Sequence, residues 1–376
     1  MADIWSLMRE LIESDEPMAI ARNPMVQFGT EQRRYLGATL LPERLVPENE
    51  FTEDRIVYFS VVANDGTRYS EPQLKKGELV GSFPVRLGEI DIARQLTGKD
   101  FDNIRRVAAN NPDAAKRSLI NWLNTACNLA MVEKAEAQRW QAMCNAAITV
   151  SQLDEEPYQI AISNPEGHRI TVPGGTVGNP AGWYETDGTY DPFSDIFKQV
   201  TLLADKGYQV SRMIGDTQIL SALANNPAVK QQVGTLTINN GALTSRVGLA
   251  DAASINAYLT GNMGLPPMEI YDATYRTQLG TQFFKPRGSL VLCAATGRTE
   301  EFMTGTDGGE FEIVENTLGY YAIGTAVGED RPGRVIRAES RNLKPVGMYA
   351  QGFATALAVI QEPESLAVIN VSKPTP

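Results

Sequence analysis

The feature that most constrains this chain is a strand-rich segment, Arg55–Ile90, that precedes a long helical segment, Asp113–Ile148. Residues 55–63 (RIVYFSVVA) are apolar on both faces, a pattern typical of a strand that is covered on both sides. The strong turn signal Asn64-Asp65-Gly66 follows directly. This part of the sequence therefore predicts a β-hairpin.

The return strand of the hairpin is expected over residues 79–87, where apolar and polar residues alternate around Phe83 and Val85. Pro84 cannot donate a backbone hydrogen bond, which indicates an edge strand or a bulge. A two-stranded hairpin on its own is only marginally stable in water. We expect another copy of the same chain to support it; an ordinary hairpin inside a larger sheet is the alternative.

The long helix is expected to begin at Asn111-Pro112-Asp113, because Pro in the first turn and Asp at the N-terminus favour a helix start. From there to Ile148 the sequence contains neither Pro nor Gly. Apolar residues recur at helical spacing: Leu119, Leu123, Ala126, Ala130, Ala137, Trp140 and Cys144. At 1.5 Å per residue this helix is roughly 50 Å long, typical of a support for a sheet.

A shorter amphipathic helix is predicted at the N-terminus. Ile4, Met8, Leu11 and Ile12 form one apolar stripe, and Ser14-Asp15-Glu16-Pro17 ends the helix. Such a helix either docks on its own domain or reaches a neighbouring molecule as an arm. Residues 18–50 show little periodicity and are expected to be an extended connection.

The rest of the chain predicts a mixed α/β unit. Helices are expected at Asp191–Ala204 and Ala252–Leu259, and strands at Gln209–Ile214, Met268–Tyr271 and Ser289–Ala295. The chain ends in two apolar strands, Phe353–Ile360 and Ser365–Val371.

Composition excludes several classes of protein. The formal net charge is −11 and no basic run exceeds two residues, so the chain lacks the Lys and Arg clusters that bind nucleic acid. Its longest apolar run is too short to cross a bilayer, and its charged N-terminus is not a secretory signal. Cys127, Cys144 and Cys293 are widely spaced, which indicates buried free thiols in a reducing cytosol.

No motif indicates an enzyme, a metal site or a cofactor. A catalytic triad would have to use His168, the only histidine, which we expect at an exposed turn. One His and three scattered Cys cannot form a structural zinc site. The glycines at 174, 175 and 178 match neither the dinucleotide fingerprint nor the P-loop. A turn explains them better than a phosphate-binding loop.

Two segments carry a resemblance to a known family. Residues 267–295 (PMEIYDATYRTQLGTQFFKPRGSLVLCAA) resemble a segment of the lambda-like major capsid protein E family of tailed bacteriophages, with Gly280, Phe284 and Pro286 before the Ser289–Cys293 strand. Residues 354–371 (ATALAVIQEPESLAVINV) resemble the closing hairpin of that family, and Arg334–Arg341 would be the strand that leads into it.

The resemblance implies an α+β chain with the Hong Kong 97-type capsid fold. That fold would place an N-terminal arm at 1–50, an extended β-hairpin loop at 51–90 and a spine helix region at 101–148. A peripheral sheet would comprise 149–190 and 331–376, and an axial α/β domain 191–330. The two terminal strands would complete the peripheral sheet.

The resemblance also implies contacts between subunits. The extended loop would touch a neighbour through Arg55, Tyr58, Phe59, Asn64, Asp65, Gly66, Arg68, Lys75, Lys76 and Phe83, and the N-terminal arm through Trp5, Met8, Leu11 and Ile12. Covalent cross-linking through Lys75 or Lys76 is left open.

The function implied is that of a major capsid protein, assembled in the host cytoplasm into the icosahedral head of a virion. Its partners would be copies of itself in pentamers and hexamers, with scaffolding, portal and decoration proteins. It would enclose double-stranded DNA without sequence-specific binding, and would need no cofactor and no membrane. The alternatives are an encapsulin-like nanocompartment subunit and a soluble α/β enzyme.

Overall fold

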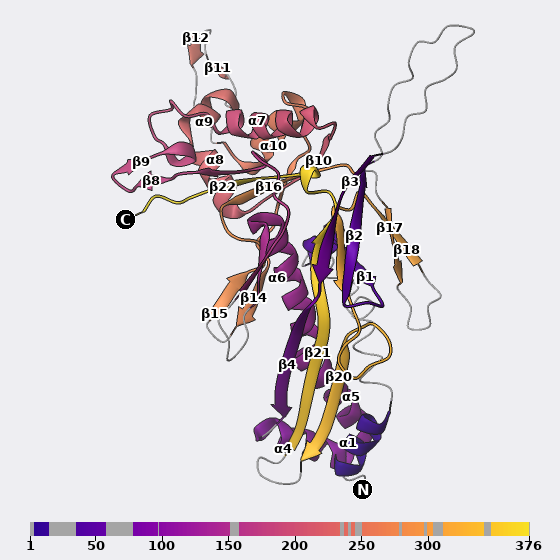
Figure 1. The fold of residues 1–376 in the computed structure, drawn as a ribbon. Coiled ribbons are helices and arrows are strands. Elements are labelled where there is room, and N and C mark those ends of the chain that lie inside the picture. Colours follow the sequence, from indigo (N-terminus) through magenta and orange to yellow (C-terminus); the bar gives the residue numbers. More distant parts are fainter. Residues whose placement is uncertain are drawn as a thin grey trace, which may run out of the picture.

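The computed structural model of the chain describes residues 4–14, 35–57, 78–96, 98–150, 158–233, 237–239, 242–244, 250–277, 280–296, 299–303, 311–341 and 347–375. Two five-stranded sheets organise these residues. One hydrophobic core covers the first sheet and one face of the second, and another core lies on the other face of the second sheet. The first sheet is long and narrow, with the long helix along one face; the second lies at one end among shorter helices (Figure 1).

The long helix runs from Pro112 to Asn145 without a break. It consists of α5 (Pro112–Leu123), a π-helical turn η2 (Asn124–Asn128) and α6 (Leu129–Asn145). The Asn111 side chain caps its start by accepting a hydrogen bond from the Ala114 amide at 3.1 Å. Ala146 adopts a left-handed conformation with φ of 52°, which ends the helix at Asn145. This is three residues earlier than the predicted end at Ile148. The predicted start is confirmed.

Two helices flank the N-terminal end of the long helix. α4 (Lys99–Asn110) precedes it and buries only Phe101 and Ala108. α1 (Ile4–Glu13) contacts α4, α5 and strand β20, and ends as expected just before Ser14. The expected spine helix region, 101–148, therefore contains most of α4, the long helix after Asn111 and the first residues of β5 (Ala147–Val150).

The first sheet has the order β1-β19-β21-β20, with β4 also paired to β21. Its strands are β1 (Glu43–Leu45), β4 (Gly88–Leu96), β19 (Gly319–Ile323), β20 (Val335–Arg341) and β21 (Gly347–Ile360). β4, β19 and β20 are all antiparallel to β21. β21 is thus the central strand on which the sheet is built.

The second sheet has the order β13-β10-β16-β22-β7. Its strands are β7 (Arg169–Val172), β10 (Val210–Gly215), β13 (Met268–Ile270), β16 (Ser289–Ala294) and β22 (Leu366–Val371). The helices α7 (Pro192–Asp205), α8 (Thr217–Asn225), α9 (Pro227–Val233) and α10 (Ala252–Gly261) share its core. The mixed α/β unit predicted from the sequence is confirmed in its helices and strands.

Smaller elements complete the described residues. Two-stranded pairs are β2 (Glu50–Val57) with β3 (Glu78–Arg86), β5 (Ala147–Val150) with β6 (Tyr158–Ala161), β8 (Gly175–Thr176) with β9 (Asn179–Pro180), β11 (Thr237–Asn239) with β12 (Ala242–Thr244), β14 (Thr274–Thr277) with β15 (Gly280–Phe283), and β17 (Thr299–Met303) with β18 (Phe311–Glu315). The short helices are α3 (Leu36–Leu40), η3 (Gly182–Tyr184) and η4 (Pro363–Ser365).

The prediction of a closing hairpin in one sheet is wrong. β21 pairs within the first sheet and β22 within the second, joined by the turn η4. Both strands are largely buried on both faces. Each also pairs with a strand on either edge, so each is an interior strand of its sheet. The allocation of 149–190 and 331–376 to one sheet fails for the same reason, because β7 and β22 join the second sheet. Conversely, β19 lies within the expected axial range 191–330 but joins the first sheet.

The long helix and β21 approach each other most closely at Gly352. A Cβ atom at this position would lie 3.0 Å from Cys127 Cβ, 3.1 Å from Met131 Cε and 3.3 Å from Ile92 Cγ2. These distances are shorter than ordinary contacts, and the groups belong to a buried core. A larger side chain here would therefore have to displace atoms of the π-helical turn and the sheet.

We predict that Gly352→Val lowers the free energy of unfolding by about 1–3 kcal/mol, because it overpacks this contact. Chemical denaturation followed by circular dichroism measures the effect. Gly261→Val is the matched control, since Gly261 has no atom within 4 Å of its added Cβ. Equal stability of the two variants would contradict the proposed close contact.

A buried carboxylate joins the long helix to both sheets. Glu136 is fully buried, and its Oε1 accepts hydrogen bonds from Gly37 N at 2.7 Å, Trp140 Nε1 at 2.8 Å and the Tyr271 hydroxyl at 3.0 Å. Burial raises the pKa of Glu136, and the nearby Arg139 and the three donors offset part of that increase. Trp140 also stacks on Tyr271, with ring centroids 5.1 Å apart.

Arg139 extends this network toward β1. Its Nε donates to Leu41 O at 2.9 Å, and its terminal nitrogens lie 3.1 Å from Glu43 Oε1 and 3.4 Å from Glu136 Oε2. Arg334 forms a second ion pair with Glu43. Burial raises the pKa of Glu43, but the two guanidinium groups outweigh burial and hold it below its usual value.

We predict that Glu136→Ala costs about 3–5 kcal/mol of stability, because it leaves buried donors and Arg139 without their acceptor. Glu136→Gln keeps an acceptor oxygen and should lose clearly less. Urea unfolding of both variants measures the difference. If alanine and glutamine variants unfold at the same urea concentration, the carboxylate does not organise this network.

The three cysteines are buried free thiols, as expected. Burial raises the pKa of Cys127 to about 11, of Cys144 to about 11 and of Cys293 to about 12. We predict that the folded protein does not react with a thiol reagent at pH 8, since the thiolate is the reactive form. Titration with Ellman's reagent should count three thiols per chain only after denaturation. Rapid reaction in native buffer would contradict this.

Candidate functional site

The hairpin β2–β3 stands apart from both sheets. Within the described part of the chain its strands pair only with each other, from Glu50↔Arg86 to Val57↔Glu78. The register shifts between Arg55 and Ile56, which marks a bulge. After Arg86 the chain turns at Leu87 and continues as β4 in the first sheet. The predicted hairpin is therefore confirmed for β2 and β3, but its predicted extent to Ile90 is wrong, because Gly88–Ile90 pair with β21 in the first sheet.

Polar contacts fix the base of the hairpin to the first sheet. Glu53 accepts hydrogen bonds from the Tyr320 hydroxyl at 2.7 Å and from the Gln361 amide. Arg86 and Glu50 form an exposed ion pair at 3.0 Å across the two strands. Val85 and Leu87 are buried, whereas Ser82, Pro84 and Arg86 are exposed. The predicted alternation of the return strand is confirmed from Ser82 to Leu87.

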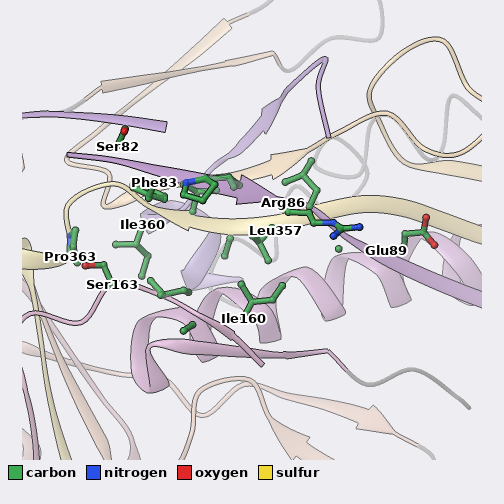
Figure 2. Close-up of a pocket in the computed structure, with 17 residues that line it drawn as sticks. Ser82, Phe83, Arg86, Glu89, Ile160, Ser163, Leu357, Ile360 and Pro363 are labelled. Atoms are coloured by element: carbon green, nitrogen blue, oxygen red, sulfur yellow. The ribbon is translucent and has the colours of Figure 1, made fainter. Parts of the chain in front are cut away.

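A groove of about 960 Å³ lies beside this base. Its walls are residues 82–89 of the β3–β4 junction, residues 160–163 at the end of β6, and Leu357–Ile360 of β21. Figure 2 shows Phe83, Ile160, Leu357 and Ile360 around this hollow, with the charged Arg86 and Glu89 along it. Ile160 and Phe83 are only partly buried in the single chain. Most of the side chains that line the groove are apolar.

The predicted loop residues fall into two groups. Phe83 lines the groove, and Arg55 lies in β2 opposite Gly81. The others lie outside the described residues: Tyr58, Phe59, Asn64, Asp65, Gly66, Arg68, Lys75 and Lys76. Their contacts with a neighbour stay a prediction.

The N-terminal helix docks on its own chain. Met8 and Leu11 are fully buried in the first core, and Ile12 packs against it. Glu10 also lies 3.5 Å from Lys116 of α5. The apolar stripe therefore covers the subunit's own helices and β20, which corrects the expected contact of Met8, Leu11 and Ile12 with a neighbour. Trp5 lies in α1, and its side chain is outside the described residues.

His168 is buried, not exposed as expected. Its Nδ1 lies 3.0 Å from Leu366 O, so the ring fixes β22 beside β7. Gly174 packs against the backbone of residues 372–374, and Gly175 has a φ of 69° in the β8–β9 turn. The structure thus confirms the turn interpretation of the glycines and gives His168 a packing role.

Sequence reasoning missed the residues that complete the groove. Ile160 lies in the short strand β6 and Ile162 directly follows it, and this segment has no periodic signal in the sequence. The groove itself has no local signal, because its walls come from three distant parts of the chain.

Among the described residues, no group of three or more His, Cys, Asp or Glu side chains is arranged to hold a metal ion. None of the helices in these ranges has the length and apolar character needed to span a bilayer.

No protein-family model matches the sequence, and no curated protein sequence matches it either. The fold, in contrast, is similar to several solved structures. A prophage protein of Escherichia coli CFT073, assigned as a capsid protein, is 13% identical with a TM-score of 0.50, covering 99% of this chain and 99% of that chain. A phage-related protein of Bordetella bronchiseptica RB50 is 13% identical with a TM-score of 0.49, covering 93% and 97%. An encapsulin of Synechococcus elongatus PCC 7942 is 11% identical with a TM-score of 0.41, covering 98% and 95%.

The similarity to the Escherichia coli protein extends over almost the whole of both chains, so it covers the long helix, both sheets and the hairpin together. The expected fold class is therefore confirmed: this chain has the α+β Hong Kong 97-type capsid fold.

Proposed function

We propose that this chain is the major capsid protein of a tailed bacteriophage, of the lambda-like E type, and that it assembles into an icosahedral head around double-stranded DNA. The observation that carries the proposal is the hairpin β2–β3, whose described strands pair only with each other. An isolated hairpin is marginally stable, so a surface outside it must contribute. We infer that the first sheet of the same subunit supports the base of the hairpin, through Glu53 and Val85, and that a neighbouring subunit in a shell supports the part of the hairpin beyond Val57 and Glu78.

The groove beside the hairpin supports the same proposal. Its half-buried apolar side chains, Phe83 and Ile160, gain burial when a second molecule covers them. In a closed shell every subunit has equivalent neighbours, so a modest contact is repeated many times. Contacts of this kind stabilise an assembly without a strong interaction between any two subunits.

The proposed partners follow from this assembly. Copies of the chain form pentamers and hexamers, and portal, scaffolding and decoration proteins complete the head, which is built in the host cytoplasm. The hairpin is the extended loop, the long helix is the spine, the first sheet is peripheral and the second is axial. A net charge of −11 suits a container that encloses DNA without binding its phosphates tightly.

Negative-stain electron microscopy of the purified protein tests the proposal. We expect closed shells or ring-shaped capsomers. Light scattering that shows only a compact monomer, with residues 55–90 protected from protease, would overturn it. Because His168 is buried and contacts Leu366 O, its replacement separates the enzyme alternative from an assembly role only in a variant whose thermal denaturation matches that of the parent.

We predict that replacing residues 58–77 by Asn-Gly abolishes shell assembly and leaves the subunit folded. Val57 and Glu78 are directly paired, so a two-residue turn can connect them without changing the register. The removed segment includes the apolar run that we assign to the neighbour. Assembly is measured by microscopy and sedimentation, and folding by thermal denaturation.

The control for this variant keeps the length and composition of residues 58–77 but scrambles their order. It should fold and fail to assemble in the same way. A truncated chain that still forms normal shells would show that the segment makes no essential contact.

A further inference from the structure

Two small hairpins of this subunit differ in the sign of their charge. We call residues 274–277 and 280–288, which contain β14, β15 and the turn before β16, the basic hairpin. We call residues 299–303 and 311–315, which form β17 and β18, the acidic hairpin. Within the described ranges, β14 pairs only with β15, and β17 pairs only with β18. Both hairpins therefore stand outside the two large sheets.

The basic hairpin carries two arginines that have no carboxylate partner in their own subunit. Arg276 and Arg287 are exposed, and among the described residues no carboxylate lies within ion-pair distance of either. Arg287 lies over the Phe283 ring, with its guanidinium carbon 4.2 Å from the ring centroid. Lys285 is buried and paired with Asp216 at 2.9 Å, so it does not contribute to this surface.

The acidic residues nearest to the basic hairpin along the chain have partners of their own. Asp272 accepts a hydrogen bond from the Thr217 amide at 3.2 Å, and Glu269 forms an ion pair with Arg212 at 2.9 Å. The sequence contains no Asp or Glu from residue 273 to residue 299. The two exposed arginines are therefore available to carboxylates of another molecule.

The acidic hairpin has the opposite composition. Its charged residues are all glutamates, two on each strand: Glu300, Glu301, Glu312 and Glu315. The sequence contains neither Lys nor Arg from residue 299 to residue 330. Strand β1 contacts β17, and its one basic residue is Arg44, which lies over the Tyr320 ring at 4.8 Å. Four glutamates and one arginine leave this part of the chain with a net negative charge.

The two hairpins cannot meet within one subunit. Figure 1 shows β14 and β15 on one side of the subunit, beyond α6, and β17 and β18 on the opposite side, beyond β1 and β2. Two complementary surfaces at different places on one chain form a head-to-tail contact between copies. Such contacts close into a ring when the rotation between neighbouring copies allows it, and a shell is built from rings of this kind.

We propose that the basic hairpin of one copy docks on the acidic hairpin of the next copy, where Arg276 and Arg287 bind glutamates of β17 and β18. This inference rests on the proposed shell function and names a contact that β2–β3 does not make. Arginine suits this contact because its planar guanidinium binds a carboxylate through two parallel hydrogen bonds. The complementary charges also fix the orientation of neighbouring copies.

Coupling with a carbodiimide tests the contact directly, because this reagent joins an amine to a carboxylate without a spacer. Arg276→Lys keeps the positive charge and supplies an amine. In assembled protein, mass spectrometry should find the introduced lysine joined to a glutamate of β17 or β18. Mixing isotope-labelled and unlabelled chains before assembly should show that the joined peptides come from two copies.

Lys206, an exposed lysine after α7, is the internal control for this coupling and should not join these glutamates. Coupling of the introduced lysine only to carboxylates elsewhere would overturn the proposal, because another surface would then cover the basic hairpin.

Charge reversal provides the second measurement. Arg276→Glu with Arg287→Glu, or Glu301→Lys with Glu312→Lys, should raise the protein concentration needed for assembly at least about tenfold, because like charges then face each other. All four changes in one chain place opposite charges together again and should restore assembly. Lys206→Glu is the matched control on another surface and should have no effect.

Reversed variants that keep the thermal stability of the parent and assemble like it would contradict the proposal. A four-site variant that folds and does not regain assembly would also contradict it. Thermal denaturation identifies a variant that fails to fold, and the coupling of Arg276→Lys then decides the question. Failure of the parent chain to assemble would instead count against the proposed function.

Discussion

The close approach of the long helix to β21 is the constraint on which the rest of the structure depends. At Gly352 an added Cβ would lie 3.0 Å from Cys127 Cβ and 3.1 Å from Met131 Cε, so the side chains of the helix pack directly against the backbone of the strand. That contact places β21 at the centre of the first sheet, where it is buried on both faces and carries β4, β19 and β20. The π-helical turn Asn124–Asn128 lies at this contact.

The buried network around Glu136 connects this layer to the second sheet. Its carboxylate receives hydrogen bonds from α3, from its own helix and from Tyr271 beyond β13. A buried charge is tolerated only where donors and a cation surround it, and Arg139 completes that condition. The two cores therefore behave as parts of one subunit, and η4 carries the chain from β21 to β22 between them. The hairpin β2–β3 and the groove beside it keep partly exposed apolar side chains outside these cores.

Local patterns in the sequence were enough to predict much of the fold. The absence of Pro and Gly after Pro112 predicted the long helix, and alternation around Phe83 predicted the return strand. The predicted exposure of His168 and the single terminal sheet were wrong. Both errors concern which strands become neighbours, and nothing within a strand records its partner on another part of the chain. The expected contact of α1 with a neighbouring subunit was wrong for the same reason, because the pattern of an amphipathic helix does not indicate whether it packs on its own chain or on another.

The sequence by itself determined where helices and strands form, because hydrophobic periodicity, capping residues and turn residues act over a few positions. It also predicted a hairpin, but it left open whether that hairpin joins a larger sheet; the structure pairs β2 and β3 only with each other among the described residues. Only the tertiary structure decided that β21 and β22 enter different sheets, that Glu136 has its donors, and that the basic and acidic hairpins lie on opposite sides of the subunit. These features depend on contacts between residues that are far apart in the sequence. The free energy gained by burying the whole core decides them, and no local pattern records it.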